Sequence, residues 1–140
     1  MKQTDNFKFD EANIMNELVY RNLSEDEKRQ ICAWKYGGEY DLYNLPAYEE
    51  MQVRQIGFMN PKSEKNYYGF WDESILVGFV NILEEKEEVF IGIGVNPDLC
   101  NKHYGQRMLL ITYEISKKLY PDKPLYLEAV SYTHLRAHET

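Results

Sequence analysis

Runs of hydrophobic and aromatic residues predict five strands along the chain. These runs cover residues 18–23, 67–72, 75–83, 89–95 and 125–130. The second, third and fourth runs follow one another with only short polar connections, which is typical of an antiparallel meander. The acidic stretch EEKEE at 84–88 separates the last two runs of this meander.

Helical periodicity and end signals predict three helices between these strands. Apolar residues recur every three or four positions after Gly105, which is the pattern of one helix face; they are Met108, Ile111, Thr112, Ile115 and Leu119. Ser24 and Glu27 have the spacing of a capping box, and Gly37-Gly38 follow as a stop. Another short helix is predicted from Pro46 toward residue 56. The order of elements predicts an α/β protein of the α+β type, with a mixed, mostly antiparallel central sheet flanked by helices.

Length and charge narrow the class of protein. A chain of 140 residues fits one domain with one hydrophobic core. The net charge of -7 argues against a nucleic-acid partner, because phosphate repels an acidic surface, and mildly favours cationic substrates such as amines. No apolar run reaches the ~20 residues that cross a bilayer. No membrane partner is therefore expected, and the polar N-terminus makes a cytoplasmic location the default expectation.

Residues 89–119 combine an apolar strand, an Asn96-Pro97 turn, a polar loop and the start of a helix. A helix N-terminus presents unpaired main-chain amides and the positive end of the helix dipole, so this arrangement can hold a phosphate group. The two cysteines, Cys32 and Cys100, form no CxxC pair and predict neither a metal site nor a disulfide framework.

The layout of elements, and above all the stretch IGIGVNPDLCNKHYGQRMLLITYEIS at 91–116, resembles the GCN5-related N-acetyltransferase superfamily. Members of that superfamily transfer an acetyl group from acetyl-CoA to an amine. The resemblance implies acetyl-CoA as cosubstrate and an amine of a small molecule or a protein as acceptor. It also implies that the strand 89–95 carries a bulge and that its main chain pairs with the pantetheine arm.

Carried over position by position, the resemblance assigns two groups of cofactor-binding residues. The strand positions that would pair with pantetheine are Ile93, Gly94 and Val95. The loop and helix start that would hold the pyrophosphate contain Asn101, Lys102, His103, Tyr104, Gly105 and Gln106. Cys100 and His103 depart from the superfamily's Gln/Arg and first glycine, and only Gly105 keeps its expected type. A protonated His103 would assist phosphate binding.

The sequence identifies the catalytic residues less clearly than it identifies the cofactor-binding residues. A carboxylate or an ordered water should accept the proton of the attacking amine, and Glu88 at the start of the strand is the nearest candidate. Glu84, Glu85 and Glu87 compete with it, and a solvated acidic turn is the alternative interpretation. The superfamily's tyrosine for the thiolate leaving group has no counterpart, since Tyr132 follows the last strand too soon. A non-catalytic CoA-binding or regulatory module of the same fold therefore stays as the alternative function.

An aromatic loop follows the first helix and falls where members of the superfamily line the acceptor site. Amphipathic rings suit a pocket that is apolar with polar tips. The alternative is that these rings cap the edge of the sheet. The residues are Trp34, Tyr36, Tyr40, Tyr43 and Tyr48.

The last ten residues, SYTHLRAHET, lack strand alternation and an apolar helix face, and they resemble translated sequencing-adapter read-through. We expect a loose extension at 1–17, a partial N-acetyltransferase domain at 18–130 that is incomplete at its C-terminus, and a non-native tail at 131–140. His134 and His138 have a metal-binding spacing but no third ligand, so no metal site is expected. Missing strands would expose a sheet edge, which would allow a homodimer.

Overall fold

The computed structural model describes residues 18–100 and 102–129. The expected extension at 1–17, the expected tail at 131–140, Asn101 and Val130 lie outside the described residues. Within the described part, the strands are β1 (Val19–Asn22), β2 (Tyr67–Asp72), β3 (Ile75–Glu84), β4 (Val89–Val95) and β5 (Leu125–Ala129). The α-helices are α2 (Glu25–Cys32), α3 (Tyr48–Arg54) and α4 (Tyr104–Leu119), and a 3-10 segment covers Gly38–Tyr43.

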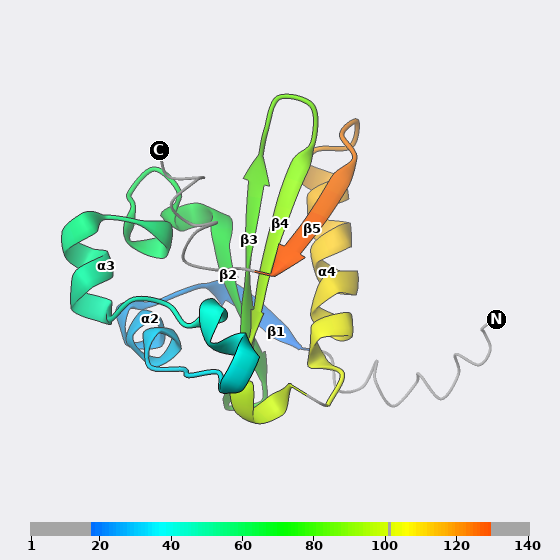
Figure 1. The fold of residues 1–140 in the computed structure, drawn as a ribbon. Helices are drawn as coiled ribbons and strands as arrows, with labels where there is room; N and C mark the ends of the chain where they lie inside the picture. The colour runs from blue at the N-terminus through cyan, green and yellow to red at the C-terminus, as the bar shows by residue number, and fades with distance from the viewer. Residues whose placement is uncertain (1–17, 101, 130–140) are drawn as a thin grey trace.

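The five strands form one sheet in the order β1-β2-β3-β4-β5 (Figure 1). The first four strands are antiparallel neighbours, and β5 runs parallel to β4. The structure thus confirms the predicted class, an α+β fold with a mixed, mostly antiparallel sheet flanked by helices. The limits of β2 and β4 agree with the predicted runs, while α3 begins at Tyr48, two residues after Pro46.

One prediction about the sheet is wrong. Val89 to Val95 of β4 pair with β3 without interruption, so the bulge expected in this strand is absent from the described pairing. The register shifts instead between Phe70 and Trp71 of β2, which face Gly78 and Leu76 of β3.

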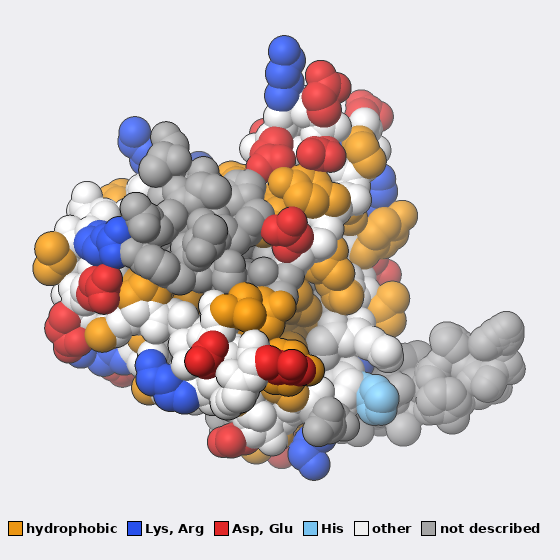
Figure 2. All heavy atoms as spheres, viewed as in Figure 1, with side chains coloured by type: hydrophobic (Ala, Val, Ile, Leu, Met, Phe, Trp, Pro, Cys, Tyr) orange, Lys and Arg blue, Asp and Glu red, His pale blue; other side chains and the backbone are white. Residues whose placement is uncertain are grey.

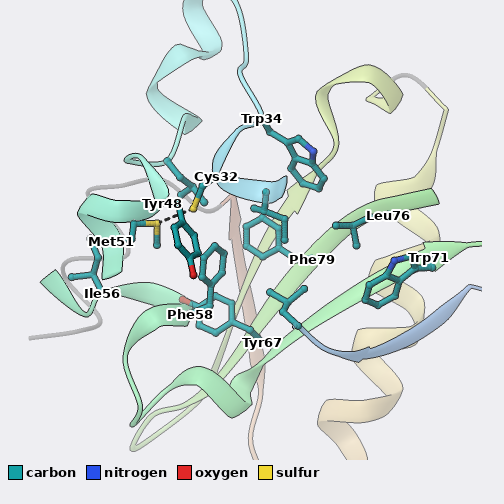
Figure 3. Close-up of a cluster of buried hydrophobic side chains, with 13 residues drawn as sticks. Cys32, Trp34, Tyr48, Met51, Ile56, Phe58, Tyr67, Trp71, Leu76 and Phe79 are labelled. Atoms are coloured by element: carbon teal, nitrogen blue, oxygen red, sulfur yellow. Dashed lines mark hydrogen bonds between the residues drawn. The ribbon is translucent and has the colours of Figure 1, made fainter. Parts of the chain in front are cut away.

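Helices cover the two faces of the sheet, so the protein has two hydrophobic clusters. One cluster joins α2 and α3 to β2 and β3 (Figure 3); it includes Ile31, Cys32, Tyr48, Met51, Tyr67, Trp71 and Phe79. The other joins α4, through Met108, to the opposite face; it includes Phe70, Val80, Ile82, Val89 and Ile91. Neighbouring strand residues such as Phe79 and Val80 belong to different clusters because successive side chains of a strand point to opposite faces.

The start of α2 is held by the predicted capping box. Ser24 Oγ accepts a hydrogen bond from the Glu27 amide at 3.3 Å, and the Ser24 amide donates to Glu27 Oε1 at 2.8 Å. Arg21 of β1 donates two hydrogen bonds to the same carboxylate, at 3.0 and 2.7 Å. The capping box therefore fixes the N-terminus of α2, and through Arg21 it also joins this helix to β1. Within the described residues, no helix is both long and apolar enough to cross a membrane.

The capping box yields a prediction for stability. Ser24→Ala removes the hydroxyl acceptor and should lower the free energy of unfolding by about 1 kcal/mol, measured by urea denaturation. Ser24→Asp keeps a side-chain acceptor and should stay within a few tenths of a kcal/mol of the wild type. Equal losses in both variants would show that the cap does not hold this helix.

Candidate functional site

The candidate site is built on Gly94, near the C-terminal end of β4. A Cβ atom at Gly94 would lie 2.5 Å from Cε1 of Phe79, so only glycine lets this ring cover the strand. The indole of Trp34 packs on Phe79, with 6.3 Å between the ring centroids (Figure 3). The segment that follows α2 is thereby held against β4.

Tyr36 ties this segment to the strand itself. Its hydroxyl donates a hydrogen bond to the main-chain carbonyl of Val95 at 2.6 Å, and its amide donates to Asn44 Oδ1 at 2.6 Å. Burial raises the pKa of Tyr36, and the nearby Cys100 adds to the effect. The phenol therefore remains protonated and a hydrogen-bond donor at neutral pH.

A cavity of about 650 Å³ lies between this aromatic segment and the end of β4, and we call it the strand-end cavity. The aromatic segment contributes Lys35, Tyr36, Gly37, Tyr40 and Tyr43; β4 and the turn after it contribute Ile93, Gly94, Val95, Pro97, Asp98 and Cys100. Figure 2 shows hydrophobic side chains beside acidic ones in this part of the molecule. The volume of the strand-end cavity is within the range of small-molecule sites, roughly 300–1,000 Å³.

The pairing of β4 decides which main-chain groups can reach a ligand. The Asn96 amide donates to the Val77 carbonyl at 2.9 Å, and hydrogen-bonded pairs alternate along an antiparallel ladder. The main-chain groups of Gly94 therefore point to β3, whereas those of Ile93 and Val95 point to the β5 side. The last described pair of β4 with β5 joins Ile93 to Ala129, so Val95 lies beyond it.

This geometry corrects the expectation for Gly94. The main chain of Gly94 cannot pair with pantetheine because it pairs with Phe79 of β3. The absence of a side chain at Gly94 makes room for the Phe79 ring. Ile93 lies within the β4–β5 ladder. Val95 keeps the expected orientation, although Tyr36 already donates to its carbonyl.

The first turn of α4 lies near the end of β4, because a Cβ atom at Gly105 would be 3.6 Å from Cγ2 of Val95, a residue that lines the strand-end cavity. Tyr104, Gly105 and Gln106 open the helix, and no described side chain caps it. The amides of a first helical turn have no acceptor within the helix, and the helix dipole is positive there. The Tyr104 hydroxyl donates to Asp72 Oδ2 at 2.6 Å, which fixes the helix start to the end of β2 and raises the pKa of Tyr104.

Gly105 is not required by the fold. A Cβ atom there would lie 3.6 Å from Cγ2 of Val95, an ordinary contact, and the residue is not among those with positive φ. Alanine is the better helix former, so neither packing nor helix propensity explains a glycine at this position. Val95, which the Cβ would touch, also lines the strand-end cavity.

His103 has a backbone conformation that favours glycine, with φ 64° and ψ 18°. This is the position where the resemblance expects a glycine, and the left-handed conformation gives the physical reason. The imidazole is exposed, as is the ammonium-bearing side chain of Lys102. Arg107 lies over the Tyr104 ring, 5.4 Å from its centroid. Three basic side chains therefore surround the first turn of α4.

Glu88 does not lie with the other predicted site residues. It precedes Val89, the first residue of β4, and its carbonyl accepts a hydrogen bond from the Glu85 amide at 2.8 Å within the β3–β4 turn. The seven residues of β4 span roughly 20 Å, so Glu88 adjoins the opposite end of the strand from the residues that line the strand-end cavity. Figure 1 shows the β3–β4 turn at the end of β4 that is far from the start of α4. Asp98, which the sequence did not single out, is the carboxylate that lines the cavity.

No family model matches the chain, and neither does any curated protein sequence. The chain is similar in structure to an aminoglycoside acetyltransferase from an uncultured soil metagenomic sample, solved in complex with trehalose. The sequences are 16% identical, the match covers 90% of this chain and 86% of the other, and the TM-score is 0.44. A similarity of this size assigns neither a family nor an activity.

Within the described residues, no three His, Cys, Asp or Glu side chains gather to hold a metal ion.

Glycine substitutions test how the site is built. Gly94→Ala should lower the free energy of unfolding by about 1–3 kcal/mol, because its methyl group would overlap the Phe79 ring. Gly105→Ala is the matched control and should change it by less than about 1 kcal/mol. Urea denaturation of both variants measures the difference, and a Gly94→Ala variant as stable as Gly105→Ala would contradict the packing described.

The backbone of His103 yields a separate prediction. A non-glycine residue in the left-handed region costs roughly 1–2 kcal/mol, and glycine loses roughly 0.5–1 kcal/mol in extra backbone entropy. His103→Gly should therefore raise the free energy of unfolding by about 0.5–1 kcal/mol. Lys102→Gly, next to it but without a positive φ, should lower it instead. A loss of stability in His103→Gly would show that position 103 is not strained.

Proposed function

We propose that this protein is an acyltransferase that binds acetyl-CoA at the C-terminal end of β4 and transfers the acetyl group to an amine. The observation that carries the proposal is Gly105. It stands at an uncapped helix start where a Cβ atom would lie 3.6 Å from Cγ2 of Val95, and Val95 lines a ligand-sized cavity, while neither packing nor backbone conformation requires glycine there.

The residues around Gly105 fit a CoA molecule. The first-turn amides of α4 can donate to pyrophosphate oxygens, and the helix dipole favours their negative charge. Lys102 and Arg107 add positive charge around the same turn. Val95, beyond the described β4–β5 pairing, leads from the helix end into the strand-end cavity, which would receive the acyl end of the molecule.

Acetyl-CoA, when bound, supplies the acetyl group and leaves as the thiol, while the amine nitrogen gains the acetyl group and loses one proton. One group of this chain suits the accompanying proton transfers. Asp98 lines the cavity with a carboxylate that can accept the proton of the amine as it attacks. Burial raises the pKa of Tyr36, which makes its phenol a weaker acid, and its hydroxyl already donates to the Val95 carbonyl, so the leaving thiolate takes its proton from solvent.

Calorimetric titration of acetyl-CoA into the protein tests the binding half of the proposal. Gly105→Trp should abolish binding by filling the space at the helix end. Val53→Trp adds the same indole to a position of α3 that is 83% exposed and should bind like the wild type. Absence of binding to the wild type, or equal binding by Gly105→Trp, would overturn the proposal.

Release of free thiol in the presence of a panel of primary amines tests the catalytic half. Turnover with any amine supports an acyltransferase, and Asp98→Asn should then slow it at neutral pH. Binding of acetyl-CoA without thiol release from any amine would instead identify a non-catalytic CoA-binding or regulatory module.

A further inference from the structure

Three tyrosines form one wall of the strand-end cavity, and we call Tyr36, Tyr40 and Tyr43 the tyrosine cage. The rings of Tyr40 and Tyr43 are nearly parallel, with centroids 6.5 Å apart and planes at 19°. The rings of Tyr36 and Tyr43 are nearly perpendicular, with centroids 6.4 Å apart and planes at 82°. The cavity is therefore bounded by ring surfaces in two orientations.

Tyr36 and Tyr43 are half-buried beside the core residues Trp34 and Phe79, whereas interior packing does not account for Tyr40. None of the three belongs to either hydrophobic cluster of the described residues. Tyr40 is 58% exposed, which is unusual for a ring that serves only the core. The Tyr36 hydroxyl donates a hydrogen bond to the Val95 carbonyl, and this bond holds its ring at the cavity wall.

The electrostatics of this wall favour a cation. The faces of aromatic rings carry negative partial charge and attract ammonium groups within about 6 Å of the ring centroid. Glu39 and Asp41 lie on the 3-10 segment that carries Tyr40 and Tyr43, close in sequence to the cage although they do not line the cavity. Lys35 is the opposing cation among the lining residues, and it is exposed to solvent.

A cage of this kind cannot serve the nitrogen that reacts. Ring faces and carboxylates stabilise the charged form of an amine, whereas attack on a thioester requires the neutral form. The group held by the cage must therefore be a second cationic group of the same substrate, which stays charged while another amine reacts.

We infer that the tyrosine cage binds an alkylammonium group and that the acceptor is an amine with at least two cationic nitrogen atoms. This inference rests on the proposed acyl transfer for the identity of the reacting nitrogen. The cation-binding property of the cage does not depend on it.

Choline and its uncharged isostere 3,3-dimethylbutan-1-ol test the cage in the absence of acetyl-CoA. Titration followed by calorimetry or NMR should show choline binding more tightly, by about fivefold or more. Equal affinity for the two probes would overturn the cage, because it would show that the cavity recognises only apolar shape. Absence of choline binding at millimolar concentrations would overturn it as well.

Variants at Tyr40 locate the effect. Tyr40→Leu removes a ring that is mostly exposed and should weaken choline binding about fivefold, whereas Tyr40→Phe keeps the ring face and should retain it. Tyr113→Leu removes a similarly exposed ring from α4, outside the cavity, and should change nothing. Loss in the Tyr113 variant as well as in Tyr40→Leu would contradict a specific site.

The identity of the acceptor is tested by comparing 1,4-diaminobutane with butylamine in the thiol-release assay. The diamine should have the higher kcat/KM, and Tyr40→Leu should reduce the ratio of the two values while Tyr40→Phe preserves it. Equal kcat/KM for both amines with an intact choline site would overturn the assignment of the acceptor. If neither amine gives thiol release while choline still binds, the proposed acyl transfer fails and the cation site stands.

Discussion

The bare Cα of Gly94 under the Phe79 ring is the contact on which the site depends. A methyl group there would overlap the ring at 2.5 Å, so the aromatic layer above β4 requires glycine at this position. Trp34 packs on Phe79, and two residues later Tyr36 reaches the Val95 carbonyl. One missing side chain thus lets the segment after α2 lie directly on the end of β4.

The cavity follows from this contact. The strand β4 runs to Val95, and the chain then turns toward α4. The aromatic segment closes one side of the resulting space and the turn at Pro97–Leu99 closes the other. The uncapped start of α4 lies close by, since a Cβ atom at Gly105 would be 3.6 Å from Cγ2 of Val95. The proposed site for an anionic group and the proposed site for a cationic group therefore both lie near the end of β4.

The sequence predicted the elements well where local signals bound them. The apolar run of β4 ends between an acidic stretch and an Asn-Pro turn, and Ser24 with Glu27 marks the start of α2. Local sequence signals did not predict the contacts between residues that are distant in the sequence. The role of Gly94 depends on Phe79, fifteen positions earlier, and a glycine in an apolar run indicates a bulge as readily as a close ring contact.

The candidate site was predicted only in part, because some of its residues are marked by local sequence patterns and others are not. The resemblance marked residue 103 as a glycine position, and the left-handed backbone of His103 explains why. Glu88 adjoins β4 in sequence, but an extended strand separates its two ends by roughly 20 Å, so a residue at one end cannot serve the other. Asp98 was missed because a single aspartate in a turn has no distinguishing pattern.

Chemical-shift mapping of backbone amides tests the central claim that the end of β4 and the start of α4 form one acyl-CoA site. Addition of acetyl-CoA to ¹⁵N-labelled protein should shift the amide signals of Val95, Tyr104, Gly105 and Gln106, and those at the β3–β4 turn should stay in place. Shifts confined to the β3–β4 turn or to β1, or no shifts at saturating acetyl-CoA, would contradict the account.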